Sequence, residues 1–321
     1  MSTREQVAAN PLAPKTLGQR FVNHMQKYWI LHLMMFLPML YYLLFHFLPL
    51  YGLQIVFRDY KPRAGITGSE WVGLANFQKF FAYYKWPNIT WNTLAISLYS
   101  IFVGFPIPIF LALTIHVNEN KVLKKVSQNI SYVPHFISVV VMVGLLWQIL
   151  NPFSGLLAAF GNLFGLVVRT DMRTNVNAFR HLYVWSGVWQ NMGWSTIMYV
   201  AALAGVSQEL HEAAKIDGAS RWRRVISVDI PAIAPTIAIM LILRFGSIMS
   251  VGHEKAYLMQ SSLNTDKSEL ISTYVYKRGI GQNQMSYGAA VGVMNSVINS
   301  TMVILVNKIA GWLSDGEAGL F

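Results

Sequence analysis

Long stretches without a charged residue dominate the pattern of this chain. Five of them exceed the roughly 20 residues that an α-helix needs to cross the hydrocarbon core of a membrane. These runs are Tyr28 to Phe57, Trp86 to Asn118, Val126 to Val168, His181 to Gln208 and Gly279 to Asn307. A sixth stretch, Ile230 to His253, carries no charge except Arg244. The pattern therefore predicts an all-α fold with six transmembrane helices.

The expected helices lie within these runs. They are predicted near Trp29 to Ile55, Thr93 to Val117, Ser131 to Leu150, Leu182 to Val206, Ala232 to Val251 and Ser286 to Leu313. The third run is long enough for two crossings, but the turn-forming segment Asn151 to Gly155 interrupts it. The remnant Gly155 to Val168 is too short to span and is interpreted as an interfacial helix. Residues 1–28 then form an N-terminal tail, residues 29–313 the membrane domain and residues 314–321 a C-terminal tail.

Composition supports a membrane protein. Hydrophobic residues make up 54% of the chain and charged residues 12%, about half the charged fraction of a soluble domain. The net charge of +11 is scattered through short connectors, which argues against nucleic acid and favours anionic lipid or an anionic solute. The absence of cysteine excludes disulfides and cysteine metal sites.

The orientation of the helices in the membrane does not follow from the number of Lys and Arg residues in the connectors, because the count is equal on the two sides of the membrane. Two short connectors, one around Lys121 and one around Arg221, are rich in Lys and Arg. Their position favours an orientation with both termini inside the cell. The connectors Arg58 to Thr90, Asn151 to Arg180 and His253 to Met285 would then face outward. They are longer, as a surface that meets an external partner requires.

The loop between the fourth and fifth spans, Ser207 to Pro231, is predicted to form two short helices with a corner. Ser207 can cap the first helix, and Gly218 suits the left-handed residue that ends it. Ser220 can cap the second helix. A third helix is expected to begin afresh at Pro231, because proline is tolerated in a first helical turn but not inside a helix.

This loop resembles the signature loop of binding-protein-dependent ABC importer permeases. The residues that match its Glu-Ala-Ala, Asp-Gly-Ala and Pro positions are Glu212, Ala213, Ala214, Asp217, Gly218, Ala219 and Pro231. Val225, Val228 and Ile230 stand where the family usually has Phe, Ile and Leu. The resemblance extends to the order of the six spans and the place of the loop between the fourth and fifth.

The segment Pro235 to Arg244 and the closing residues Gly319 to Phe321 are similar to the polysaccharide and oligosaccharide branch of that family. This branch includes the membrane subunits of maltose importers, and the nearest resemblance is to those of bacterial alginate importers. The resemblance implies the type I importer permease fold and a multi-pass place in the bacterial inner membrane. It also implies a carbohydrate cargo, acidic if the alginate likeness holds.

The same resemblance implies a set of partners. They are a second homologous permease subunit, two ATPase subunits that bind ATP and Mg, and a periplasmic or extracellular solute-binding protein. Residues 207–231 would be the coupling loop, which docks into a groove of the ATPase, and the chain itself would need no cofactor. An alternative function is a stand-alone secondary transporter driven by an ion gradient, although such proteins carry buried acids or inverted repeats that are not evident here.

Catalytic and metal motifs are lacking in the sequence. No glycine is followed by lysine, so the phosphate-binding Gly-x-x-x-x-Gly-Lys-Ser/Thr loop is absent and ATP hydrolysis is expected in another chain. His211 and Glu212 begin like the helix motif of zinc proteases, but Lys215 occupies the position of the second histidine and would repel a metal. No metal site and no catalytic residue are therefore predicted.

Arg244 is a charge in the interior of the expected fifth helix, and a guanidinium at the centre of a bilayer costs about 3 kcal/mol or more. It could line the translocation path and bind hydroxyls or a uronate carboxylate of a sugar. It could equally pair with helix carbonyls or with an acid on a second membrane subunit. The sequence leaves both interpretations open, with the structural one favoured.

Further candidates for the pathway lie on the fourth and sixth helices. Trp185 and Trp189 lie one turn apart and could stack on sugar rings, although membrane tryptophans more often form interfacial belts. Asn191 follows them. Asn295 and Asn299 could face a partner helix or a polar cavity, beside a stripe of small residues that is typical of helix packing: Gly288, Gly292, Ser296 and Ser300.

Overall fold

The structure, a computed structural model, describes residues 17–165 and 171–313. The chain divides into two compact units, residues 1–55 and residues 56–321, and each is described by itself. The expected C-terminal tail and most of the N-terminal tail lie outside the described residues. Within the described part, α1 (Leu17–Tyr42) has a kink at Tyr28, where the first span was expected to start. It continues through a π-helical segment, Leu43–Phe47, and a 3-10 segment, Leu48–Phe57.

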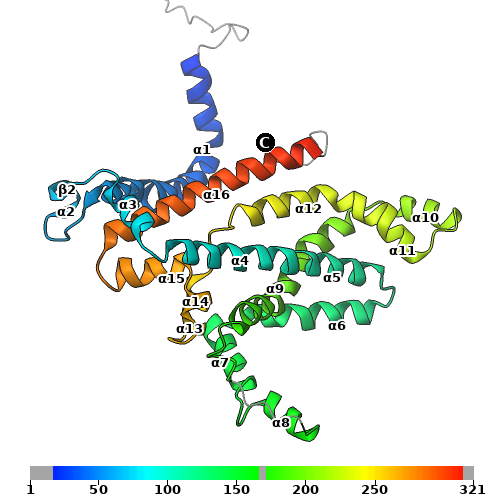
Figure 1. Cartoon of the computed structure of the whole chain (residues 1–321). Coiled ribbons are helices and arrows are strands. Elements are labelled where there is room, and N and C mark those ends of the chain that lie inside the picture. The colour runs from blue at the N-terminus through cyan, green and yellow to red at the C-terminus, as the bar shows by residue number, and fades with distance from the viewer. Residues whose placement is uncertain (1–16, 166–170, 314–321) are drawn as a thin grey trace, which may run out of the picture. The chain divides into compact units, whose positions relative to one another are not determined.

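The second unit is almost entirely helical (Figure 1). Its α-helices are α2 (Gly65–Gly68), α3 (Ala75–Ala82), α4 (Trp86–Gly104), α5 (Pro106–Val117), α6 (Lys121–Tyr132), α7 (Val139–Ile149), α8 (Leu156–Leu163), α9 (Ala178–Ala204), α10 (Gln208–Ile216), α11 (Arg221–Arg224), α12 (Ile230–Phe245), α13 (His253–Met259), α14 (Thr265–Ser268), α15 (Ile271–Val275) and α16 (Met285–Leu313). A small antiparallel ribbon joins β1 (Arg58–Asp59) to β2 (Glu70–Trp71), with Arg58 opposite Trp71.

Helix α9 is the centre of the second unit, because it packs against α4, α5, α6 and α12. Gly193 lets α6 come close, since a Cβ at this position would overlap the backbone carbonyl of Ser131. Helices α4 and α5 follow one another along one line, and the coupling loop lies at the end of α12 that is remote from α13, α14 and α15 (Figure 1).

Buried apolar side chains of the second unit gather in clusters along the helices. One cluster joins α4, α15 and α16 and includes Ile89, Ile101, Ile271 and Val291. A second includes Ile96, Met142, Phe179 and Met259. A third lies beside the coupling loop and includes Tyr199, Leu203, Val225 and Ile233. Val225 therefore packs the coupling loop against the bundle.

Within the described residues, four helical segments are long and apolar enough to cross a membrane. They are Asn23–Phe57, Trp86–Val117, Arg221–Phe245 and Met285–Trp312. A fifth span arises if the bent pair Lys121–Phe136 and Val139–Ile149 counts as one. Helix α9 is 27 residues long, but it is not among these segments, so the sixth span stays a prediction.

The prediction of one unbroken third helix from Ser131 to Leu150 is wrong. The chain bends by 101° between the two halves of this segment. Pro134 lies in a 3-10 turn, Val133–Phe136, after which Ile137 is extended and Ser138 caps α7 by accepting a hydrogen bond from the Val141 N–H. The Gln190 amide of α9 donates to the Ile137 carbonyl at 2.8 Å, which satisfies an acceptor that the break exposes.

The fifth helix differs from prediction at both ends. Helix α12 starts at Ile230 with Pro231 in its first turn, as predicted, but Arg221–Phe245 is one continuous helical segment, so the chain does not break before the proline. A π-helical turn, Val225–Asp229, precedes the proline, and such a wider turn relieves the clash between a proline ring and the carbonyls before it. The helix ends at Phe245 instead of Val251, and Asn299 of α16 accepts a hydrogen bond from the Met249 N–H at 2.9 Å in the turn that follows.

The break after the third span is confirmed. The Asn151 side chain accepts hydrogen bonds from the N–H groups of Phe153 and Ser154, which closes a turn between α7 and α8. Helix α8 then covers Leu156–Leu163, within the remnant that was predicted to be a short helix. Its eight residues are too few to cross a bilayer.

Asn92 of α4 joins three parts of the second unit and provides a test of the fold. Its fully buried amide donates to the carbonyls of Asp266 and Glu269 at 2.8 and 3.1 Å and accepts from the Arg180 guanidinium at 2.7 Å. We expect Asn92→Ala to lower the free energy of unfolding by roughly 2–4 kcal/mol, because it leaves buried polar groups and a cation unpaired. Thermal unfolding of the purified chain measures this.

The matched control is Asn88→Ala. Asn88 is exposed and donates to the same Asp266 carbonyl at 2.9 Å, so water can replace its hydrogen bond and we expect little change. Equal unfolding temperatures of the two variants would contradict the structural role of Asn92.

Candidate functional site

The coupling loop folds as its sequence predicted up to the second helix. Ser207 caps α10 by accepting from the Glu209 N–H, and Ser220 caps α11 by accepting from the Arg223 N–H. Gly218 has a φ of +75°, and the Ala219 N–H donates to the Ala214 carbonyl at 2.9 Å across the corner. The left-handed residue and its hydrogen bond end α10 as in the common glycine-containing helix terminus.

The residues that carry the family resemblance lie on the surface of this loop. Glu212, Ala213, Asp217, Gly218 and Pro231 are exposed, whereas Ala214 and Ala219 are half-buried. Large apolar side chains stand among them: Leu210, Ile216, Trp222 and Ile226 are between 54% and 86% exposed. Several large apolar side chains exposed on one loop are typical of an interaction site. We name these four side chains the apolar ridge.

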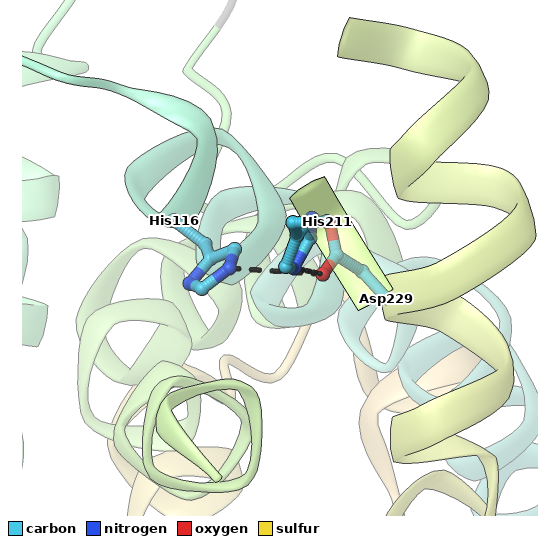
Figure 2. A group of neighbouring side chains, drawn as sticks. All are labelled: His116, His211 and Asp229. Atoms are coloured by element: carbon cyan, nitrogen blue, oxygen red, sulfur yellow. Dashed lines mark ion pairs between the residues drawn. The ribbon is translucent and has the colours of Figure 1, made fainter. Parts of the chain in front are cut away.

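Beneath the loop, side chains from three elements meet around Asp229, as Figure 2 shows. His211 of α10 places Nε2 3.1 Å from Asp229 Oδ1, and His116 at the end of α5 places Nε2 3.6 Å from the same oxygen. A pocket of about 240 Å³ adjoins them. On the helix of His211, Lys215 stands where the zinc-protease motif has its second histidine. The partners of His211 come from other elements, so the local sequence gives no signal of this cluster.

A second candidate site is a polar cavity at the middle of the bundle. Two adjoining hollows of about 410 and 180 Å³ share Ser100, Tyr183, Arg244 and Gly252 in their walls. The Arg244 side chain is exposed to this cavity, and its guanidinium makes no hydrogen bond or ion pair within the part of the chain that the structure describes. The alternative that it pairs with carbonyls of its own bundle therefore finds no support in these contacts.

Lys255 of α13 is a second cation in the wall of the larger hollow, and it was not among the predicted pathway residues. Its ammonium donates to the Tyr183 carbonyl at 2.7 Å and lies 4.6 Å from the centre of the Tyr183 ring. The residue is only 8% exposed, and burial lowers the pKa of this amine to about 7. A lysine in a connector gives no sequence signal of burial, since its burial depends on the packing of α13 against α7, α9 and α15.

The other predicted pathway residues divide into two groups. Asn191 lines the larger hollow, and its side-chain oxygen accepts a hydrogen bond from His135 Nδ1 at 3.0 Å. Trp185 and Trp189 are half-exposed and are not among the residues that line either hollow. Trp185 instead donates to the Tyr99 hydroxyl at 3.0 Å. Sugar stacking on these two rings stays a prediction.

The asparagines of α16 have different surroundings. Asn299 holds the turn after α12, since it accepts from the Met249 N–H and donates to Ser250 Oγ at 2.8 Å. The Asn295 side-chain oxygen is buried and accepts no hydrogen bond within the described residues. Of the small-residue stripe, Gly288 packs closely on Gly279, whereas Ser296 and Ser300 are exposed on α16.

Comparison with known proteins places the loop and the bundle in a family. Residues 104–314 match the model of the binding-protein-dependent transport system inner membrane component. This match covers more than half of the chain and includes the whole coupling loop. The chain belongs to this family. It is a membrane permease, as the signature loop indicated.

Relatives extend the match to nearly the whole permease. This chain is 38% identical over 296 residues to the polygalacturonan/rhamnogalacturonan transport system permease protein YteP of Bacillus subtilis. The match covers 92% of this chain and 91% of that protein. It is 37% identical over 281 residues to protein LplB of the same organism, covering 87% and 88%. These relatives confirm the predicted likeness to permeases of the oligosaccharide and polysaccharide branch.

Solved structures show the same fold. The permease superposes with a TM-score of 0.83 and 32% identity on a chain of a bacterial ABC transporter involved in the import of the acidic polysaccharide alginate, covering 90% of this chain and 98% of that one. A second structure contains the alginate transporter with its pentasaccharide-bound periplasmic protein, again with a TM-score of 0.83. The expected resemblance to an alginate importer is confirmed.

Proposed function

We propose that this permease forms half of the membrane pathway of an ATP-driven importer for acidic oligosaccharides or polysaccharides. The observation that carries the acidic cargo is the unpaired Arg244 guanidinium, which shares a cavity wall with Lys255. Two cations in a half-enclosed cavity favour a cargo with carboxylates, because guanidinium binds carboxylate in two parallel hydrogen bonds. The printed names of the similar proteins, polygalacturonan and alginate transporters, point to the same chemical class.

Energy reaches the cavity from a separate ATPase. The apolar ridge and Glu212 supply the docking surface, which two ATPase subunits with bound ATP and Mg would contact on this permease and on its homologous partner. Closure of the ATPases pushes the coupling loop, and the helices respond by changing the side to which the cavity opens. A periplasmic or extracellular solute-binding protein delivers the cargo at the opposite face.

This arrangement sets the membrane topology. Helix α9 lies among α4, α5, α6 and α12, so it serves as the remaining span although its own sequence is less apolar. Six spans in the type I arrangement place both termini and the coupling loop in the cytoplasm. The loop then lies beside the α5–α6 connector, which agrees with the Glu119 to Arg221 ion pair of 3.2 Å between them.

The decisive experiment reconstitutes the full importer with its binding protein in lipid vesicles. We expect uronate oligosaccharides to stimulate ATP hydrolysis and enter the vesicles, and uptake should survive an ionophore that removes ion gradients. Uptake that stops with the ionophore and needs no ATP would favour the secondary transporter. Stimulation by neutral sugars alone would overturn the acidic cargo and leave the importer assignment intact.

Lys255 gives this proposal a pH dependence. Because burial lowers its pKa from the usual range near 10.5 to about 7, the amine loses its charge as the pH rises through about 7. We expect uronate uptake to decline between pH 6 and pH 8, and Lys255→Met to be slower at pH 6 and to lack this decline. Initial uptake rates against pH measure it.

The same pKa shift predicts the effect on stability. Between about pH 7 and pH 10.5 the unfolded chain binds a proton that the folded chain has lost, so Lys255 makes stability rise with pH in this window. Lys255→Met should flatten that rise and raise the unfolding temperature at pH 7. The control is Lys79→Met at an exposed position of α3, which should change neither profile.

A further inference from the structure

His116, His211 and Asp229 converge from three separate elements of the coupling end (Figure 2). His116 lies in the last turn of α5, His211 in the middle of α10, and Asp229 ends the π-helical turn before α12. One nitrogen from each histidine and one oxygen of the aspartate all lie within 4.8 Å of one another. Two imidazoles and a carboxylate are a donor set that transition metals bind.

The buried atoms of the cluster lack ordinary hydrogen bonds. Asp229 is 1% exposed, and its Oδ1 accepts no aligned hydrogen bond within the described residues. His211 Nε2 is likewise buried without an aligned partner, although the two atoms are only 3.1 Å apart. Within the described residues, the contacts of Asp229 Oδ1 are the two ion pairs with His211 and His116, and neither is an aligned hydrogen bond. Buried polar atoms are nearly always hydrogen-bonded, so this convergence without aligned bonds favours a shared ligand between the three side chains.

The distances fit a metal ion. Zinc bonds of about 2.0–2.2 Å to nitrogen and oxygen in a tetrahedron place neighbouring ligand atoms about 3.3–3.5 Å apart. The two measured ligand separations, 3.6 Å from His116 and 3.1 Å from His211 to Asp229 Oδ1, lie on either side of this range. A fourth ligand position can face the adjoining pocket of about 240 Å³.

The charged side chains around the cluster favour some metal ions over others. Lys124, Lys215, Arg221 and Arg224 line the same pocket, and Glu119 is paired with Arg221. These positive groups disfavour Mg²⁺ or Ca²⁺, which need several anionic oxygen ligands. They also weaken Zn²⁺ binding, but two imidazoles provide affinity that does not depend on net charge alone.

We propose that His116, His211 and Asp229 bind one Zn²⁺ ion, which ties α10 of the coupling loop to α5 and to the start of α12. The site replaces the expectation of no metal ligand in this chain. It joins the helix that carries Glu212 to two helices of the bundle, so the ion stiffens the junction through which the loop moves. The binding itself does not depend on the nature of the cargo.

The test is direct metal binding to the full-length chain, purified with its companion subunits and stripped by a chelator. Zn²⁺ titration should show one site per chain, and X-ray absorption should report two imidazole nitrogens and one or two oxygens near 2.0 Å. Wild-type protein without a stoichiometric site would overturn the proposal. So would a spectrum without histidine ligands.

Variants locate the ion. We expect His116→Gln, His211→Gln and Asp229→Asn each to reduce Zn²⁺ affinity at least tenfold. His46→Gln in the first unit serves as the control and should bind as the wild type does. Unchanged binding in all three cluster variants would place the ion elsewhere and contradict the assignment.

A rescue variant covers the case in which substitutions impair folding. His211→Cys keeps a metal ligand at the same position and exchanges nitrogen for sulfur, so it should retain Zn²⁺ and bind Cd²⁺ more tightly than the wild type does. Cd²⁺ bound to this variant should show a sulfur ligand by X-ray absorption. A folded His211→Cys protein that binds neither ion would also overturn the site.

Discussion

Uptake is expected to fall to background when Gly218 is replaced by valine, while the importer still assembles in the membrane. Gly218 has a φ of +75° at the corner of the coupling loop, and a β-branched residue there costs at least 1–2 kcal/mol of backbone strain. The loop can avoid this strain by changing the angle between α10 and α11. The apolar ridge would then no longer fit the ATPase.

The measurement compares uptake with ATP hydrolysis in reconstituted vesicles. In the Gly218→Val importer, hydrolysis should persist at a basal rate that cargo no longer stimulates, and Glu212→Ala should show the same uncoupling. The matched control is Gly65→Val, because Gly65 has a φ of +70° and open space around it but lies far along the chain from the loop. Normal uptake by both coupling-loop variants would contradict the docking role.

Arg244→Met is expected to slow uronate uptake by about 10- to 100-fold. Hydrogen bonds to a charged group contribute about 1.5–3 kcal/mol, and every 1.4 kcal/mol is a factor of ten. Methionine preserves the apolar stem of the side chain, so the membrane domain should fold at least as well without a charge in a span. Uptake of labelled uronate oligosaccharides, with ATPase assembly verified, measures the effect.

Arg244→Lys is the conservative control for this position. It keeps the charge but loses the planar pair of donors, so we expect a loss smaller than that of methionine. If the Arg244→Met and Lys255→Met importers both transported uronates at the wild-type rate, these two cations would not bind the acidic groups of the cargo. Arg244 would then pair with the second membrane subunit, the other interpretation that the sequence left open.

The parts of the permease that the sequence predicted are those that local chemistry decides. Ser207, Gly218 and Ser220 act through hydrogen bonds and dihedral angles within a few residues, so their roles followed from the loop sequence. The break at Asn151 was predictable for the same reason. The family resemblance added the partners that no single residue could indicate.

The features that escaped prediction depend on contacts between distant segments. Pro134 alone cannot distinguish a bend from a helix start, and the Gln190 amide that supports the bend comes from α9. The helix start at Pro231 was predicted, but the π-helical turn that joins α11 to α12 without a break was not. The burial of Lys255 and the meeting of His211 with Asp229 likewise require the folded bundle.

The continuous helix from Arg221 to Phe245 has a mechanical consequence. Trp222 of the apolar ridge and Arg244 of the cavity lie on one rod, separated by about 33 Å at 1.5 Å per residue. When a rigid helix pivots near its middle, its two ends move by similar distances in opposite directions. Under the proposed mechanism, a push of about 3 Å at the tryptophan would swing the guanidinium by a comparable distance in the opposite direction, enough to break its proposed hydrogen bonds to a carboxylate.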